Sequence, residues 1–263
     1  MPLRGFEKSL LRLLAAHRNP ESFVAGATVL LRDPESHRRS QDIDVFHDTV
    51  ESLTIASDND CRVLREHGYT ATMDKAQETF RRAIVSNTEG TTKVEWVFDS
   101  AFRFFPIEPD PELGYVLNFW DAATNKLLAM AGRGELRDYL DVLYLDRKHL
   151  SLGALAWAAS GKDLGFTPQF VLEEAQRLAH YAKPALEKID LTQPVDLVEC
   201  KKHFRKACDA AFLLFNQLPA EEVGCLYLNE QNIPVTPDPA LPDFAKLRRH
   251  FGSVRGAWPV IRE

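Results

Sequence analysis

Cysteine is scarce in this sequence, and its scarcity excludes two kinds of stabilised domain. The chain of 263 residues contains four cysteines (Cys61, Cys200, Cys208 and Cys225), and no two are spaced as C-x-x-C. Such scattered positions indicate neither a zinc site nor a disulfide framework. Long apolar runs are also missing: none approaches the ~18 consecutive residues of a membrane span, and no signal-peptide hydrophobic segment follows the first residues. We expect a reduced, cytoplasmic protein with no membrane partner.

An excess of positive charge is absent as well. Lys and Arg number 32 against 38 Asp and Glu, which gives a net charge of −6. This balance argues against extended nucleic-acid binding through bulk electrostatics. A local basic cluster nevertheless occurs at Arg32, His37, Arg38 and Arg39. It is either a basic track for a phosphate-bearing ligand or a solvated loop, and the sequence leaves both readings open.

The most informative segment of the chain is the one from Asp42 to His47, which carries two acids among apolar residues. Residues i and i+2 of a strand point to the same face, so Asp42 and Asp44 project together while Ile43 and Val45 anchor the strand to a core. Two adjacent carboxylates repel each other unless a cation lies between them. Mg²⁺ commonly takes one or two carboxylates and completes its shell with phosphates and water. The pattern predicts a magnesium site for a phosphate-bearing substrate, and the alternative is a harmless pair on a solvated face.

A turn of small residues, Ala25-Gly26-Ala27-Thr28, precedes this strand. A glycine in such a turn allows the backbone to approach a triphosphate closely and to offer it N–H groups. Together with the acid pair and the adjoining Arg38, Arg39 and Ser40, the turn is more specific than an isolated Asp-x-Asp.

Turn and acid pair together resemble the nucleotidyltransferases of the polymerase-beta superfamily, in which a Gly-Ser turn precedes an Asp-x-Asp pair. The string from His37 to Phe46 is similar, more narrowly, to that of the AbiEii/AbiGii toxin branch, which reads His-Arg-Arg-Ser-x-Asp-Ile-Asp-Leu-Phe. Ala27 departs from the superfamily pattern, so a hydroxyl for the phosphates has to come from Thr28. The resemblance implies that Asp42 and Asp44 are catalytic and bind Mg²⁺, and that the NTP is bound by Gly26, Ala27, Thr28, Arg39 and Ser40.

A third acid is expected on a neighbouring strand. From Thr92 to Phe98 apolar residues alternate with others, the period of a half-buried strand, and Glu95 falls on its polar side. The superfamily places a third metal ligand on such a strand, so the resemblance implies that Glu95 is catalytic and completes a two-metal site. Asp99, on the same face, is the reserve candidate, and the bland reading of Glu95 is a solubilising charge.

A second match to the AbiEii branch lies on two expected helices, 122–131 and 135–148. The branch repeats a Lys, Ala, Arg and Arg-Asp-x-x-Asp-Leu arrangement there, carried in this chain by Lys126, Arg133, Arg137, Asp138 and Asp141. The resemblance implies that Lys126 is catalytic through contact with the phosphates, and that Arg133, Asp138 and Asp141 belong to the nucleotide-binding set. The structural alternatives are a solvated Lys126 and an Arg137–Asp141 ion pair that is architectural. Because Lys126 is expected away from the packing stripe of the helices, its removal should cost little stability.

The fold predicted is α/β (α+β): a small, mixed, twisted nucleotidyltransferase sheet in residues 1–120, followed by a helical C-terminal region in residues 121–263. Asp121 is expected to cap the first helix of that region, Gly132 and Gly134 to break it, and a hairpin and a last helix to end the chain. The expected strands are 23–25, 42–47, 69–73, 80–86, 92–98 and 115–119, with the hairpin at 225–227 and 233–235; the other expected helices are 6–17, 28–32, 50–67, 153–160, 168–181, 195–217 and 244–251.

The function predicted is a metal-dependent nucleotidyltransferase that transfers NMP from an NTP to an acceptor and releases pyrophosphate. The resemblance implies an RNA 3′ end as one acceptor and a role as the toxin of a type IV toxin–antitoxin pair, with a cognate antitoxin as partner. Two alternatives stay open: transfer to a small molecule such as an antibiotic hydroxyl, and a catalytically degenerate nucleotide-binding interaction protein.

Overall fold

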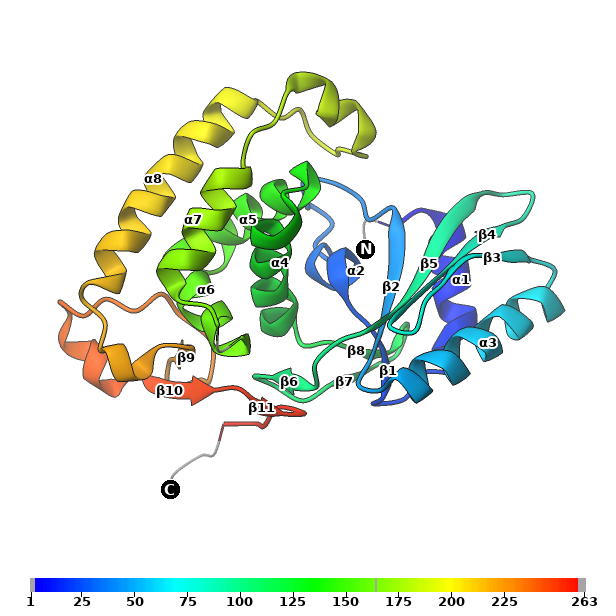
Figure 1. Ribbon diagram of the computed structural model, residues 1–263, viewed down its shortest axis with the longest axis horizontal. Coiled ribbons are helices and arrows are strands. Elements are labelled where there is room, and N and C mark those ends of the chain that lie inside the picture. The colour runs from blue at the N-terminus through cyan, green and yellow to red at the C-terminus, as the bar shows by residue number, and fades with distance from the viewer. Residues whose placement is uncertain (1–2, 164, 260–263) are drawn as a thin grey trace. The chain divides into compact units, whose positions relative to one another are not determined.

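A seven-stranded mixed sheet forms the centre of the N-terminal part of the chain in the computed structural model, which describes residues 3–163 and 165–259 (Figure 1). Its strand order is β3-β4-β5-β2-β1-β8-β7. The β2–β5 and β1–β8 pairs are parallel, and the others are antiparallel. The predicted mixed sheet is thus confirmed; its strands are β1 (Ser22–Val24), β2 (Asp42–His47), β3 (Thr70–Ala76), β4 (Phe80–Ser86), β5 (Thr91–Phe98), β7 (Glu108–Asp110) and β8 (Gly114–Val116).

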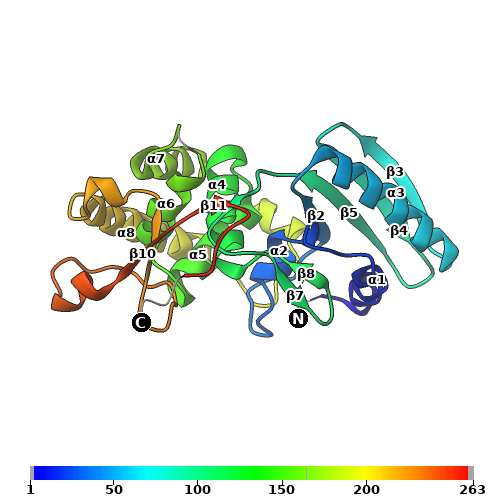
Figure 2. The ribbon, with the colours of Figure 1, turned by 90° about the horizontal axis from the view of Figure 1, so that it is seen from below.

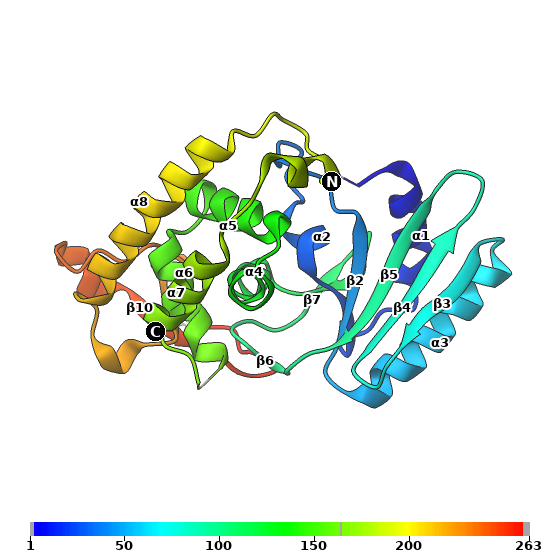
Figure 3. The same ribbon diagram turned by 45° about the horizontal axis from the view of Figure 1, so that its top comes forward.

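The chain divides into two compact units, and this sheet belongs to the first, which holds the residues up to 101 and residues 106–122. Its helices are α1 (Gly5–Ala15), α2 (Gly26–Leu30) and α3 (Val50–Glu66). Helices α1 and α3 lie along one face of the sheet, as Figure 3 shows. Ile43, Val45 and Val94 are fully buried, while Phe98, expected to be buried with them, is 38% exposed at the end of β5.

A buried polar network lies inside this unit. Arg18 and Asp60 form an ion pair with both side chains about 1% exposed. Trp96 donates its indole N–H to Asp60 Oδ2 at 2.8 Å, and Arg18 donates to Ser22 Oγ at 2.7 Å. Ser22 Oγ lies 3.1 Å from His47 Nε2. Because buried polar groups are costly unless they are paired, these contacts fix α3 and the three strands β1, β2 and β5 in one arrangement.

His47 makes the stability of this unit depend on pH. Burial and, secondarily, the charge of Arg18 lower the pKa of His47 from 6.5 to about 4. Between pH 6.5 and pH 4 His47 is protonated in the unfolded chain but neutral in the folded one. The free energy of unfolding therefore falls as pH decreases from about 6.5 to about 4. The free energy of unfolding should drop by roughly 2 kcal/mol between pH 7.5 and pH 5 on account of this group alone. Urea unfolding of the wild type and of His47→Gln at both pH values measures the difference, and parallel pH dependences would contradict the assignment.

The second unit, residues 102–105 and 123 onward, is mainly helical. Helix α6 is buried along its whole length and contacts α5, α7 and α8 (Figure 2). Within the described residues, none of the helices has both the length and the apolar composition of a membrane span. The helices are α4 (Phe119–Arg133, which begins in the first unit), α5 (Leu136–Lys148), α6 (Leu152–Ala159), α7 (Pro168–Leu178) and α8 (Leu197–Phe215); two small sheets pair β9 (Cys225–Leu228) with β10 (Arg248–Phe251) and β6 (Phe102–Arg103) with β11 (Ser253–Val254).

Two predicted features of α4 are wrong. The helix begins at Phe119, and Asn118 caps it by accepting a hydrogen bond from Trp120 N–H at 2.9 Å, so Asp121 lies in the first turn and is fully buried. An Asn before the first turn satisfies an N–H group that lacks a helical partner, just as an Asp would. Gly132 does not break the helix; Gly134, with φ +63°, follows its last residue.

The end of the chain also differs from its prediction. The expected last helix over 244–251 is a short 3₁₀ turn at Pro242–Lys246 followed by strand β10. The strand forms because β9, whose four residues are all buried, needs a partner for its backbone groups. The expected hairpin partner at 233–235 makes one bridge, Leu228 with Pro234, where proline offers no N–H for a longer ladder.

Candidate active site

The two acids of β2 lie on the face of the sheet opposite to α1 and α3, which is called the acidic face here. Burial alternates along the strand: Ile43 and Val45 are buried, whereas Asp42 and Asp44 are half-buried. The alternation follows from the two-residue period of a strand, and the predicted boundaries of the strand, 42–47, are those found. The sequence thus places both carboxylates on one face without any special backbone geometry.

The turn before helix α2 is built against the second acid. Gly26 has φ +63°, and a Cβ atom at this position would lie 2.1 Å from Asp44 Oδ2. Ala25 N–H donates to the carbonyl oxygen of Asp44 at 3.0 Å. The left-handed backbone favours glycine, and the close approach excludes any side chain. Turn and acid therefore form one local structure, although about twenty residues of chain separate them.

Glu95 lies directly opposite Asp44 in the parallel β2–β5 pairing. On its other side Glu95 faces Arg82 of β4, whose guanidinium Nη1 is 3.7 Å from Glu95 Oε1. Arg82 also donates its Nε–H to Asp74 Oδ1 at 3.0 Å. A row Arg82–Glu95–Asp44 therefore crosses three strands on the acidic face, as the pairing predicts for residues that share a face.

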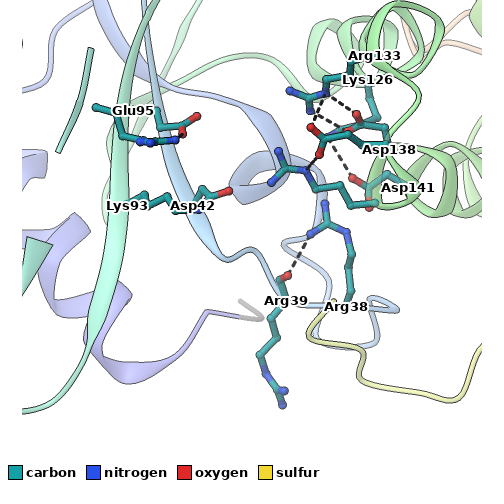
Figure 4. A network of polar contacts seen from close by, with 12 residues as sticks. Arg38, Arg39, Asp42, Lys93, Glu95, Lys126, Arg133, Asp138 and Asp141 are labelled. Carbon is teal, nitrogen blue, oxygen red and sulfur yellow. Dashed lines mark hydrogen bonds and ion pairs between the residues drawn. The ribbon is translucent and has the colours of Figure 1, made fainter. Parts of the chain in front are cut away.

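Two cations on this face were missed by the sequence prediction. Lys93 faces Asp42 across the β2–β5 pair, and Lys93 Nζ lies 3.6 Å from Asp42 Oδ1 (Figure 4). Arg82, beside Glu95, is the second. Lys93 precedes Glu95 by two residues, so the strand period alone already placed both side chains on one face. Asp42 and Glu95 thus each have a cation nearby, which lowers the repulsion between the carboxylates.

The other phosphate-binding candidates of this unit occupy different environments. Thr28 is buried, and Thr28 Oγ1 has no hydrogen-bond partner within the part of the chain that the structure describes. Ser40 Oγ–H donates to the carbonyl oxygen of Asp42 at 2.9 Å, which fixes the start of β2. Arg38 is only 2% exposed and donates to the carbonyl oxygen of Arg39 at 3.1 Å, so the basic cluster is not simply a solvated loop.

Lys126, in the second unit, is buried rather than solvated. Its side chain is 8% exposed, and Nζ lies 2.9 Å from Asp138 Oδ1 and 3.1 Å from Asp141 Oδ2, contacts that join α4 to α5 (Figure 4). The expected position of Lys126 away from the packed side chains, on which the small predicted cost in stability rested, is therefore wrong. Asp138 and Asp141 lie in the first and second turns of α5, three residues apart, so both face the same side of the helix and reach the same ammonium group.

Asp138 is held ionised at the centre of this cluster. Burial by itself would raise the pKa of Asp138, but the hydrogen bond from Arg133 and the charge of Lys126 outweigh it and lower the pKa. Arg133 Nε lies 2.7 Å from Asp138 Oδ2. Arg137, expected to pair with Asp141, lies with Nε 2.6 Å from Glu135 Oε2. Both oxygens of Asp138 are engaged by protein cations, so its clearest role is to orient Lys126 and Arg133.

The donor set on the acidic face fits Mg²⁺ in its chemistry. Asp42 and Asp44 supply two carboxylates on one face, and Mg²⁺ is usually bound by one or two carboxylates together with substrate phosphates rather than by an all-protein cage. Among residues 3–163 and 165–259, no group of three or more His, Cys, Asp or Glu side chains is placed to hold a metal ion, so Asp42, Asp44 and Glu95 do not form a ready-made three-carboxylate cage. The orphaned hydroxyl of Thr28, beside Gly26, suits a phosphate oxygen.

The geometry matches the fold of nucleotidyltransferases. The chain is similar to MenT4, a nucleotidyltransferase toxin from Mycobacterium tuberculosis H37Rv, with a TM-score of 0.57, 18% identity and coverage of 82% of this chain and 83% of that one. It is also similar to a candidate nucleotidyltransferase from H. pylori (TM-score 0.51, 16% identity, 81% and 94% covered). A third match is JHP933 from Helicobacter pylori (TM-score 0.50, 17% identity, 80% and 91% covered).

No protein-family model and no curated protein matches the sequence itself. The resemblance to nucleotidyltransferases predicted from the two motifs is confirmed at the level of the fold. The fold places the Asp-x-Asp strand, the glycine turn and the Glu95 strand side by side within the first unit.

Proposed function

We propose that this protein is a metal-dependent nucleotidyltransferase that transfers NMP from an NTP to an acceptor and releases pyrophosphate. The observation that carries the proposal is the close approach of Gly26 to Asp44. A Cβ atom at position 26 would lie 2.1 Å from the carboxylate oxygen Oδ2 of Asp44, so the approach excludes a side chain of any size. A backbone turn with N–H groups beside a pair of carboxylates suits a metal-bound triphosphate. The nucleotidyltransferase fold supports the same reaction.

Each candidate residue has a role that its surroundings support. Asp42 and Asp44 would hold Mg²⁺ against the triphosphate. Glu95 would help them to bind the metal that lies nearer the acceptor hydroxyl. When bound, Mg²⁺ supplies positive charge for the attacking and leaving oxygens. The backbone of Gly26, Ala27 and Thr28 would bind phosphate oxygens, with Arg39 and Ser40 beside it. Lys126, flanked by Arg133, Asp138 and Asp141, would bind NTP phosphates as a compact positive charge.

The acceptor we propose is an RNA 3′ end, with the protein acting as the toxin of a toxin–antitoxin pair. The support is the string His37–Phe46, which is similar to that of the AbiEii branch, and the likeness of the fold to MenT4, itself a nucleotidyltransferase toxin. A cognate antitoxin would be the protein partner.

A label-transfer assay tests this proposal. The protein is incubated with each α-labelled NTP and total cellular RNA, with Mg²⁺ or with EDTA. We expect label on RNA only with Mg²⁺, and none from the double variant Asp42→Asn/Asp44→Asn. The matched control is Asp58→Asn, an exposed acid that pairs with Arg81. Label on a small molecule would replace the RNA acceptor, and no transfer with any NTP to either acceptor would refute the reaction.

Glu95→Gln should lower turnover strongly while leaving NTP binding nearly unchanged. The reason is that this carboxylate is proposed to act near the attacking hydroxyl, whereas the NTP is held by Asp42 and Asp44. Single-turnover transfer and equilibrium binding of a non-hydrolysable NTP measure the two effects separately. Asp99→Asn, beyond the end of β5, is the comparison: an active Glu95→Gln beside an inactive Asp99→Asn would move the third acid to position 99.

A further inference from the structure

A pocket of about 290 Å³ lies in the second unit among α5, α7 and α8. It is called the α5–α8 pocket here, and its volume lies just below the usual range of ligand-binding cavities, about 300–1,000 Å³. All of its lining residues belong to this unit, and none of the assigned site residues is among them. The lining residues are Tyr139, Gln176, Ala179, His180, Lys201, Phe204 and Arg205.

Aromatic rings make up the buried part of the lining. Tyr139 is 1% exposed and Phe204 is 6% exposed, and their ring centroids are 5.2 Å apart in an edge-to-face arrangement. Tyr139 also packs against Tyr181, at 5.0 Å between centroids. A rigid aromatic surface of this kind, with the small Ala179 beside it, favours a flat apolar or aromatic group.

Tyr139, one of the lining residues, carries a hydroxyl that the protein does not use. Its hydroxyl is buried and has no hydrogen-bond partner within the described part of the chain. A buried hydroxyl without a partner costs free energy, and a ligand atom that can accept or donate a hydrogen bond would recover it. Gln176 adds an amide to the same lining. The ligand therefore combines a flat ring with hydrogen-bonding atoms, as a nucleobase does.

The exposed part of the lining is positively charged. Lys201 and Arg205 are exposed, stand four apart on α8 and so share one face of the helix. Among residues 3–163 and 165–259 neither forms an ion pair, in contrast to the adjacent Lys202, which lies 2.7 Å from Glu199. His180 lies beside them, and none of the described lining residues is acidic. Unpaired Lys and Arg at the edge of an aromatic pocket suit a phosphate.

We propose that the α5–α8 pocket binds a phosphate-bearing nucleoside, with the base against Tyr139 and Phe204 and the phosphate at Lys201 and Arg205. The ligand is either a free nucleotide or one nucleotide of a single-stranded nucleic acid, because both present the same ring and the same charge. This site goes beyond the proposed transfer reaction: its residues lie outside the acid pair, and binding here does not depend on Asp42 or Asp44.

Titration calorimetry tests the proposal on the full chain carrying Asp42→Asn/Asp44→Asn, in EDTA, so that neither metal nor transfer contributes. The probes are the four nucleoside monophosphates, a short single-stranded RNA and inorganic phosphate. We expect binding that weakens with salt, at least tenfold weaker in Lys201→Gln/Arg205→Gln. The matched control is Lys202→Gln/Lys206→Gln, which has the same spacing and charge change on the same helix. Tyr139→Phe removes an unpaired hydroxyl, so it should fold normally and weaken nucleotide binding several-fold.

Each outcome of this titration either assigns the ligand of the α5–α8 pocket or overturns the proposed site. Binding of monophosphates assigns the site to free nucleotides, and binding of the RNA alone assigns it to a nucleotide within a strand. Equal affinity for inorganic phosphate and nucleotides would overturn the role of the aromatic lining. Equal losses in the two double variants, or no binding at millimolar concentrations of any probe, would overturn the site. Because transfer is tested separately with an intact acid pair, failure here leaves the transferase proposal standing.

Discussion

Replacing Gly26 by alanine should reduce nucleotide transfer a hundredfold or more while leaving the protein folded. The added Cβ would meet Asp44 Oδ2 at 2.1 Å, and the cheapest escape is rotation of that carboxylate, which is the end of a side chain, away from its place. Misplacing a catalytic group by about 1 Å can cost on the order of a hundredfold in rate. The left-handed backbone at φ +63° adds about 1–2 kcal/mol of destabilisation. Label transfer and urea unfolding of the same preparation measure both effects.

Gly68→Ala is the matched control for this substitution. Gly68 also has positive φ, +83°, but nothing lies within 4 Å of its Cβ position, at the end of α3. Both variants should therefore lose a similar free energy of unfolding, and only Gly26→Ala should lose transfer. If Gly26→Ala transfers label within a few-fold of the wild type, the contact between the turn and Asp44 has no catalytic meaning. If both variants lose transfer equally, backbone strain rather than the carboxylate is responsible.

Strands with a strict two-residue alternation were predicted closely. Strand β2 has the predicted boundaries, and β4 and β5 differ by one residue at most. Periodicity reports which face each residue occupies, so it also placed Glu95 and Asp42 on polar faces. It carries no information about which strands are neighbours. The pairing of Asp44 with Glu95, and of Glu95 with Arg82, therefore became visible only in the structure.

Features decided by tertiary contacts escaped prediction. The segment Arg248–Phe251 has the composition of a helix end, yet it forms β10 because the buried strand β9 lies beside it. Lys126 appeared to be a surface lysine because charged residues are rarely buried without partners. Its partners, Asp138 and Asp141, lie on the next helix, and only the packing of α4 against α5 shows that all three meet.

Replacing Lys126 by methionine should destabilise the second unit by about 3–5 kcal/mol, the usual cost of removing one partner from a buried ion pair. Asp138 keeps Arg133, but Asp141, 1% exposed, loses the ammonium 3.1 Å away. Transfer should fall as well, by about 2–4 kcal/mol of transition-state stabilisation if the ammonium group contacts the phosphates. Urea unfolding gives the first quantity, and single-turnover label transfer at a temperature where the variant is folded gives the second.

The double variant Lys126→Met/Asp141→Asn separates the two roles of the lysine. A neutral amide at position 141 removes the buried carboxylate that contacted the ammonium group, so much of the stability should return. Transfer should not return, because the positive charge proposed to bind phosphates is still missing. Asp141→Asn alone should lower stability modestly and keep most of the transfer activity. A double variant that recovers stability and transfer together would make Lys126 purely architectural, and an Asp141→Asn protein that is stable but inactive would place Asp141 in the active site.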